Sequence, residues 1–316
     1  MTRRSLPVAV ALAGLIGLLA VPAAAEDRIE KDLKLDPGGE FRLETAVGAV
    51  TVTGSPDPGA HVVITSRRKD LNELLTFRFE ESPGSARVIA KKRHQSWFSH
   101  SDDGVQYEVR VPAETRLSID TSGGSIKISG TRGHAKLDTS GGSIHVNDLL
   151  GDLYGNTSGG SIRLADVKGT IRVETSGGGI EGRNLDGTVR AESSGGSIEL
   201  EKVTGDLDAE TSGGGIRIVD AGGRVRADTS GGSIEASFTK GNSKGGTLET
   251  SGGGIEVSLD PEANLSIQAS GNSVKTDLPL RVQGEISRGR LSGSLGKGGN
   301  TLSLHTSGGS VRIQGL

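Results

Sequence analysis

The chain has 316 residues, of which 51 are glycine and none is cysteine, and its formal net charge is −3 at pH 7. The lack of cysteine excludes a disulfide framework and thiol chemistry. The slight acidity excludes a general electrostatic attraction to nucleic acid, which we do not expect as a partner. The glycines follow no G-X-Y period, so the chain is not collagen-like.

Residues 1–25 have the layout of a secretory signal peptide. Arg3 and Arg4 precede an apolar run over residues 6–20, and an A-x-A cleavage pattern ends at Ala25. A membrane anchor is the alternative, but the run is shorter than the roughly 20 residues that span a bilayer. We therefore expect an exported protein that is periplasmic, associated with the cell surface or secreted, with no integral membrane segment once the signal is removed.

Residues 26–116 form a β-rich lead-in. Apolar and polar residues alternate in several short runs, the longest of which covers residues 105–111 and ends at Pro112. Such alternation is typical of strands with one buried face. We expect a short antiparallel β-layer that caps the first coil of the following region, because an open sheet end would be a template for aggregation.

One loop in the lead-in combines basic, aromatic and acidic residues and holds the only tryptophan of the chain. The residues that we select from it as a candidate binding loop are Lys91, Lys92, Arg93, His94, Trp97, Phe98 and His100. Exposed aromatic side chains on loops often contact partners. The alternative is that Trp97 and Phe98 fold back and plug the end of the core, and the sequence leaves both interpretations open.

Residues 117–316 consist of an internal repeat. The phrase Thr-Ser-Gly-Gly-Ser/Gly-Ile, or a close variant, recurs with an 18-residue period from Thr121 to Thr229, and again at Thr250 after a step of 21. If this threonine is position 1, apolar residues fall at positions 6, 8, 11, 15 and 17, and glycine falls at position 13. Thr45 opens an isolated earlier copy. Steps of two residues are the periodicity of strands.

This pattern predicts an all-β fold, namely a parallel β-solenoid with 18-residue coils and strands at positions 5–9 and 14–18. One repeat buries too little apolar surface to fold alone, whereas stacking joins the apolar columns into one core. We expect the threonine at position 1 to form a half-buried column. A β-propeller or a sandwich of hairpins is the runner-up, although propeller blades need about 40–45 residues.

The outward positions favour a solvated surface. Position 18 is nearly always acidic, and position 16 on the same face often carries Lys or Arg. A ladder of cation sites is the alternative, but the calcium-binding nonapeptide pattern is absent. The corner serine recurs in every coil, whereas a nucleophile would occur once beside a base. His134 and His145 fall on different strands. We expect no catalytic residue, no metal and no cofactor.

The run from Val111 to Ile126, Val-Pro-Ala-Glu-Thr-Arg-Leu-Ser-Ile-Asp-Thr-Ser-Gly-Gly-Ser-Ile, resembles a known pattern. It is similar to the bacterial β-strand-repeat domains of unknown function that are described as putative adhesins. The resemblance covers about Phe41 to Ile313. It implies an extracytoplasmic β-solenoid and brings no catalytic residues to this chain.

Three functions remain open on the sequence. The first is a non-catalytic, adhesin-like binding or scaffold protein of the cell envelope or exterior, whose partner would be an unknown envelope glycan or protein. The second is a polysaccharide-active enzyme on a β-helix, which the bare 18-residue coils disfavour. The third is a self-assembling envelope filament subunit, which capped ends would oppose. The oligomeric state is left open.

Overall fold

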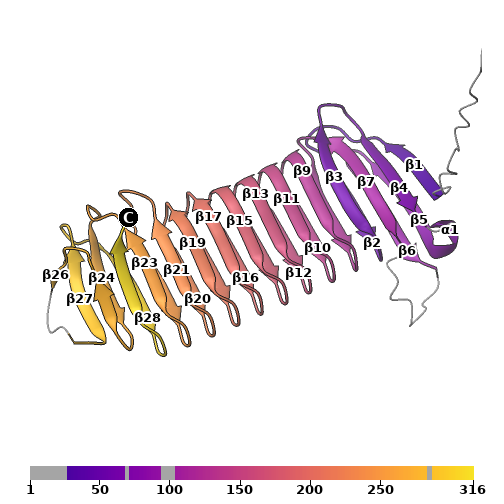
Figure 1. The fold of residues 1–316 in the computed structure, drawn as a ribbon. Helices are drawn as coiled ribbons and strands as arrows, with labels where there is room; N and C mark the ends of the chain where they lie inside the picture. Colours follow the sequence, from indigo (N-terminus) through magenta and orange to yellow (C-terminus); the bar gives the residue numbers. More distant parts are fainter. Residues whose placement is uncertain (1–26, 68–70, 94–103, 283–286) are drawn as a thin grey trace, which may run out of the picture.

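The computed structural model describes residues 27–67, 71–93, 104–282 and 287–316, so the predicted signal peptide lies outside the described residues. Two long sheets face each other along an elongated rod, as Figure 1 shows. We name the 14-stranded sheet A and the 15-stranded sheet B. The predicted all-β solenoid is confirmed. Within the described ranges, no helix is long and apolar enough to cross a membrane.

Both sheets run along the whole rod, and their strands follow one another in space from its N-terminal end. In this order, sheet A contains β1 (Asp27–Leu33), β4 (Ala60–Ser66), β7 (Val105–Pro112), β3 (Ala49–Ser55), β9 (Ile126–Arg132), β11 (Ile144–Leu150), β13 (Ile162–Lys168), β15 (Ile180–Asp186), β17 (Ile198–Val203), β19 (Ile216–Ala221), β21 (Ile234–Phe238), β23 (Ile255–Leu259), β29 (Val311–Gly315) and β25 (Val274–Thr276). Sheet B contains β5 (Leu75–Ser82), β6 (Ser85–Lys92), β2 (Glu40–Thr45), β8 (Arg116–Thr121), β10 (Ala135–Thr139), β12 (Leu153–Thr157), β14 (Ile171–Thr175), β16 (Val189–Ser193), β18 (Leu207–Thr211), β20 (Val225–Thr229), β22 (Gly246–Thr250), β28 (Asn300–Thr306), β24 (Leu265–Ser270), β27 (Arg290–Leu295) and β26 (Arg281–Val282). The helix α1 covers Leu71–Leu74.

Each regular coil consists of one strand in each sheet. Equivalent residues of successive copies pair in parallel register, as Thr139 does with Thr157 and Ile144 with Ile162. The apolar positions point inward, and Ile162 and Val167 are at most 1% exposed. Because every coil repeats this pattern, the side chains form continuous apolar columns between the sheets.

The threonine at position 1 is more deeply buried than the sequence analysis expects, with Thr157 only 1% exposed. Its hydroxyl donates a hydrogen bond to the carbonyl of Gly142 in the preceding coil, over 2.7 Å. It also accepts a hydrogen bond from the backbone N–H of Gly160 in its own coil, over 3.2 Å. The same pair of bonds recurs along the rod, so the column of hydroxyls connects successive corners while satisfying its own buried polar atoms.

The sheet A strands extend further than the predicted positions 5–9. Strand β11 runs to position 12 and bends at Asp148, whose φ is 55°. Equivalent residues in the neighbouring coils share this left-handed conformation, with Asn184 at φ 53° and Gly130 at φ 65°. Gly, Asn and Asp tolerate that region better than most residues. Because of this bend, the same strand points the side chains of positions 8 and 11 into the core, as Val146 and Leu149 show.

The N-terminal end contains the predicted antiparallel pairs and also extends the parallel ladders. Strand β4 pairs antiparallel with β1 and β7, and β5 pairs antiparallel with β6. Strands β2 and β3 are parallel members of the solenoid, and Thr45 lies in register with Thr121. The isolated copy at Thr45 is therefore a true coil. The coil of β6 and β7 stacks on its outer side.

The C-terminal end also departs from chain order. The last coil, formed by β28 and β29, lies between the coil of β22 and β23 and the coil of β24 and β25. Strand β27 then pairs antiparallel with β24. In Figure 1 these strands close the end of the rod farthest from β1.

Candidate functional site

The candidate binding loop leaves the solenoid at a corner that is short in the regular coils. Ala90 pairs with Thr45 and so occupies position 1, and Tyr107 pairs with Val50 at position 6. A regular coil joins these two positions through a segment of four, such as 122–125, whereas the longer segment 91–106 does so here. The corner therefore carries a 12-residue insertion, since that segment is sixteen long instead of four.

The structure describes only the first residues of the predicted site. Lys91, Lys92 and Arg93 are exposed where the chain leaves β6. Their side chains make no ion pair with the rest of the described chain. His94, Trp97, Phe98 and His100 lie outside the described residues. The choice between a binding loop and a plug made by Trp97 therefore stays a prediction.

The core beside this corner is filled by another aromatic residue. Tyr107 is fully buried, and its hydroxyl lies 2.8 Å from the Thr45 hydroxyl. Burial raises the pKa of Tyr107 to about 12, and the hydrogen bond to Thr45 acts in the opposite direction. The sequence pattern places Tyr107 only on an alternating strand and does not indicate that it fills this end of the core.

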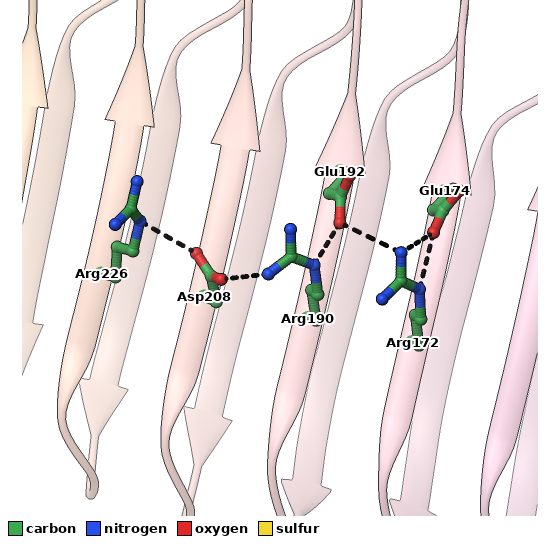
Figure 2. A network of polar contacts seen from close by, with 6 residues as sticks. All are labelled: Arg172, Glu174, Arg190, Glu192, Asp208 and Arg226. Carbon is green, nitrogen blue, oxygen red and sulfur yellow. Dashed lines mark hydrogen bonds and ion pairs between the residues drawn. The ribbon is translucent and has the colours of Figure 1, made fainter.

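Charged side chains at positions 16 and 18 on sheet B form ion pairs both between these two columns and along position 16, as Figure 2 shows. Arg172 contacts Glu174 at 2.6 Å and Glu192 at 3.7 Å. Arg190 contacts Glu192 and lies 2.7 Å from Asp208, which Arg226 approaches to 3.6 Å. The predicted balancing of charges is confirmed over this stretch, whereas at Asp120 burial, followed by the like charges of Asp138 and Glu44, raises the pKa of the carboxyl group. Exposed pairs of this kind contribute only about 0.2–1 kcal/mol each, and their main effect is to relieve repulsion within the column.

The histidines of the described chain lie apart from one another. His61 contacts Asp32 at 2.6 Å, His134 contacts Asp152 at 3.2 Å, and His305 lies 2.7 Å from the Ser270 hydroxyl. Among residues 27–67, 71–93, 104–282 and 287–316, no three His, Cys, Asp or Glu side chains converge in a way that could hold a metal ion.

A shallow groove on the outer face of sheet A was not anticipated. Its volume is about 620 Å³, and it crosses the strands from β3 to β17, with Glu181, Glu199 and Glu201 along its far part. Lys127, His145 and Arg163 occupy position 7 on three adjacent strands along one side of it. Reading position 7 down successive copies would have revealed this row, whereas the sequence interpretation above compares His145 only with His134, on a different strand.

The fold and its surface define a parallel β-solenoid repeat protein. The chain belongs to the Toastrack DUF4097 family, which matches residues 42–314. This confirms the resemblance drawn from the sequence. No curated protein shows a significant sequence match to the chain.

Several solved structures resemble the chain. A putative adhesin from Bacteroides fragilis shares 12% identity with a TM-score of 0.37, covering 92% of this chain and 97% of that one. A putative cell adhesion protein from Clostridium sporogenes shares 12% identity with a TM-score of 0.26, covering 92% and 100%. A putative lipid binding protein from Parabacteroides distasonis shares 14% identity with a TM-score of 0.30, covering 91% and 96%. With identities and TM-scores this low, their ligands are not carried over to this chain.

Proposed function

We propose that the protein is an exported, non-catalytic, adhesin-like binding protein of the cell envelope or exterior, in which the solenoid is a scaffold for a binding loop. The observation that carries the proposal is the 12-residue insertion between Ala90 and Tyr107, at a corner that elsewhere closes in four residues. Loops held on a rigid β-scaffold are frequent positions for binding residues.

The first three residues of the candidate binding loop, 91–93, which we call the loop root, favour an anionic partner. Lys91, Lys92 and Arg93 present three exposed cations that the described chain does not neutralise. Unpaired charges of one sign raise the local concentration of oppositely charged ligands. Trp97 and Phe98 follow within the same loop and would supply apolar contact area with few rotatable bonds. An envelope glycan or an acidic envelope protein fits this combination.

The regular coils support a scaffold role. On sheet B their charged side chains form ion pairs along the rod, as between Arg190 and Asp208. On this sheet, similar coils with compensated charges offer little to distinguish one position from the next. Specific recognition is therefore expected where the repeat is interrupted, and the loop root is such a place.

The test uses the chain from Glu26 to Leu316 and cell-envelope fragments in a pull-down with defined salt. The double variant Trp97→Ala and Phe98→Ala should lose most binding and keep its melting temperature. The triple variant Lys91→Ser, Lys92→Ser and Arg93→Ser should weaken binding, most strongly at low salt.

A matched control removes exposed cations from another interruption of the repeat, through Lys240→Ser and Lys244→Ser. This variant should bind like the parent. Equal losses in the control and the loop variants would contradict the proposal, as would a large fall in melting temperature for Trp97→Ala and Phe98→Ala. Release of sugars from polysaccharides by the parent protein would overturn the non-catalytic role.

A further inference from the structure

The row Lys127, His145 and Arg163 departs from the charge pattern of its column. These residues occupy position 7 on β9, β11 and β13 and are direct neighbours in the parallel register. Neighbouring strands are about 4.8 Å apart, so three basic side chains stand side by side over about two strand spacings. Farther along the same column Arg217 has an acidic neighbour on each side, because it contacts Glu199 at 3.8 Å and also pairs with Glu235.

The row is only partly neutralised. Arg163 contacts Glu181 at 3.0 Å on the side away from His145. Lys127 and His145 form no ion pair within the described part of the chain. Arg163 approaches the His145 Nε2 atom to 3.5 Å. At this distance a neutral imidazole accepts a hydrogen bond from the guanidinium. Protonation of His145 places like charges directly opposite each other on the sheet, which is destabilising, and an anionic ligand would relieve that repulsion.

The groove beside the row has space for such a ligand. Positions 7 and 9 of successive strands form its two sides, and position 9 carries the small neutral residues Ser129, Asn147 and Ala165 opposite the cations. The backbone of the intervening position lies at the bottom, since its side chains point into the core. The groove extends from Thr51 on β3 to β17, but Glu181, Glu199 and Glu201, with Arg183, line its part over β15 and β17. The basic part therefore covers β9, β11 and β13, a span of about 10 Å at ~4.8 Å per strand.

We propose that this groove binds an acidic polysaccharide segment that lies along the rod axis, with its carboxylates on Lys127, His145 and Arg163. Charge-assisted hydrogen bonds from Lys, protonated His and Arg to carboxylates are among the stronger polar contacts in proteins. Ser129 and Asn147 can exchange hydrogen bonds with sugar hydroxyls on the opposite side. The groove is open towards Thr51 on β3, so an acidic chain can continue on that side, away from the glutamates of β15 and β17. The site is separate from the loop root and goes beyond the function proposed above.

The protonation state of His145 should make ligand binding at this site depend on pH. Burial, followed by the nearby charges of Arg163 and Lys127, lowers the pKa of His145, while Glu181 opposes this shift. A bound carboxylate favours the protonated imidazole and so raises its pKa. Binding therefore takes up protons, and affinity increases as the pH falls from 8 towards 5.

The experiment measures binding of oligogalacturonate, of defined length, by calorimetry at low salt. The parent protein should bind it and should take up protons on binding. The variant Lys127→Gln with Arg163→Gln should weaken binding about tenfold or more, since two charge-assisted contacts to carboxylates are lost. The variant His145→Gln should bind with an affinity that no longer rises as the pH falls.

The matched control is Arg217→Gln with Arg312→Gln, which removes the same charge from the same column outside the groove. It should change the affinity by less than about twofold. Melting curves show whether each variant is folded. No binding by the parent, equal loss in the control, or equal binding of neutral oligosaccharides or single-stranded DNA would overturn the proposal.

Failure of the proposed function is distinguishable from failure of this inference. Variants of Trp97 and Phe98 should leave oligogalacturonate binding in the groove unchanged. Conversely, envelope binding that depends on the loop would persist if oligogalacturonate did not bind.

Discussion

The middle of the rod and its two ends are built by different rules. From the coil of β10 and β11 to the coil of β22 and β23, each coil stacks on the coil that precedes it in the chain. At the N-terminal end the coil of β2 and β3 lies between two later coils, and at the C-terminal end the coil of β28 and β29 lies between two earlier ones. Antiparallel strands cover the outer coil in both sheets at the first end and in sheet B at the second.

The middle coils therefore determine the length of the rod, and the end coils determine where the stacking stops. In the middle, the same corner and the same Thr–Gly hydrogen bonds recur, so another coil could be added without a new kind of contact. At the ends, the first and the last coil of the chain each lie between two other coils. An antiparallel strand then covers the edge on which a further parallel strand could pair. Covering an edge in this way limits end-to-end association of sheets. The loop insertion lies in the outer parallel coil of the first end.

The largest effect should come from a charge placed inside a regular coil. Ile198 is fully buried, whereas the side chain of its neighbour Glu199 is 61% exposed. Ile198→Asp should reduce the free energy of unfolding by more than about 4 kcal/mol, because a buried carboxylate has no partner there. Glu199→Lys should change it by less than about 0.5 kcal/mol. Urea unfolding compares them, and equal losses would refute the inside–outside assignment.

The corners of the middle coils offer a comparison of adjacent glycines. A Cβ atom on Gly160 would lie 2.0 Å from the carbonyl oxygen of Gly142, whereas the nearest atom to a Cβ on Gly159 is 3.6 Å away. Gly160→Ala should therefore cost about 3 kcal/mol, since a backbone clash forces neighbouring coils apart. Gly159→Ala should be nearly neutral in urea unfolding. If the two variants unfolded alike, coil-to-coil contact at this corner would not be as close as the structure indicates.

At the N-terminal end, Tyr107 should make stability depend on alkaline pH. Its folded pKa of about 12 exceeds the ordinary value of 10. The unfolded chain therefore loses this proton first, and the stabilisation, fully present below pH 10, declines as the pH rises to 12. The decline should be about 2–3 kcal/mol. Tyr107→Phe should remove it, whereas the control Tyr154→Phe should retain it. The same decline in both variants would contradict the assignment.

A smaller effect should follow loss of one hydroxyl from the threonine column. Thr175 donates to the Gly160 carbonyl over 2.8 Å and accepts from the Gly178 N–H over 3.3 Å. Thr175→Val should lower the free energy of unfolding by about 1–2 kcal/mol, because both backbone groups lose a buried partner. Thr175→Ser should be milder, since Ser193 makes the same contacts in the next coil. A valine variant as stable as the serine variant would show that these bonds contribute nothing.

The middle of the rod was predictable because its evidence is local and repeated. The 18-residue period and the inward positions, such as Ile162 and Val167, follow from spacing alone. The alternation of Arg190, Asp208 and Arg226 could also be read from one column. The bend at position 10 was only weakly indicated, because Asp148 and its equivalents are also ordinary outward residues on a strand.

The ends were less predictable for a physical reason. All coils present similar apolar columns, so the pattern that opens at Thr306 could stack on any coil. Which neighbour it takes depends on loop lengths and on the antiparallel strands, and these are non-local. The groove was missed because Lys127, His145 and Arg163 belong to three successive repeats, and their meaning appears only when the coils are aligned.

The central claim is that the middle coils set length while binding depends on the N-terminal part of the rod. Deleting residues 212–229 removes one 18-residue repeat and joins Thr211 directly to Ser230. This deletion should give a folded protein about 4.8 Å shorter, measured by small-angle scattering, with envelope binding unchanged. Deleting residues 212–228 should prevent folding of the C-terminal coils, because a one-residue slip turns inward side chains outward. Loss of binding after the 18-residue deletion, in a protein that remains folded, would contradict the account.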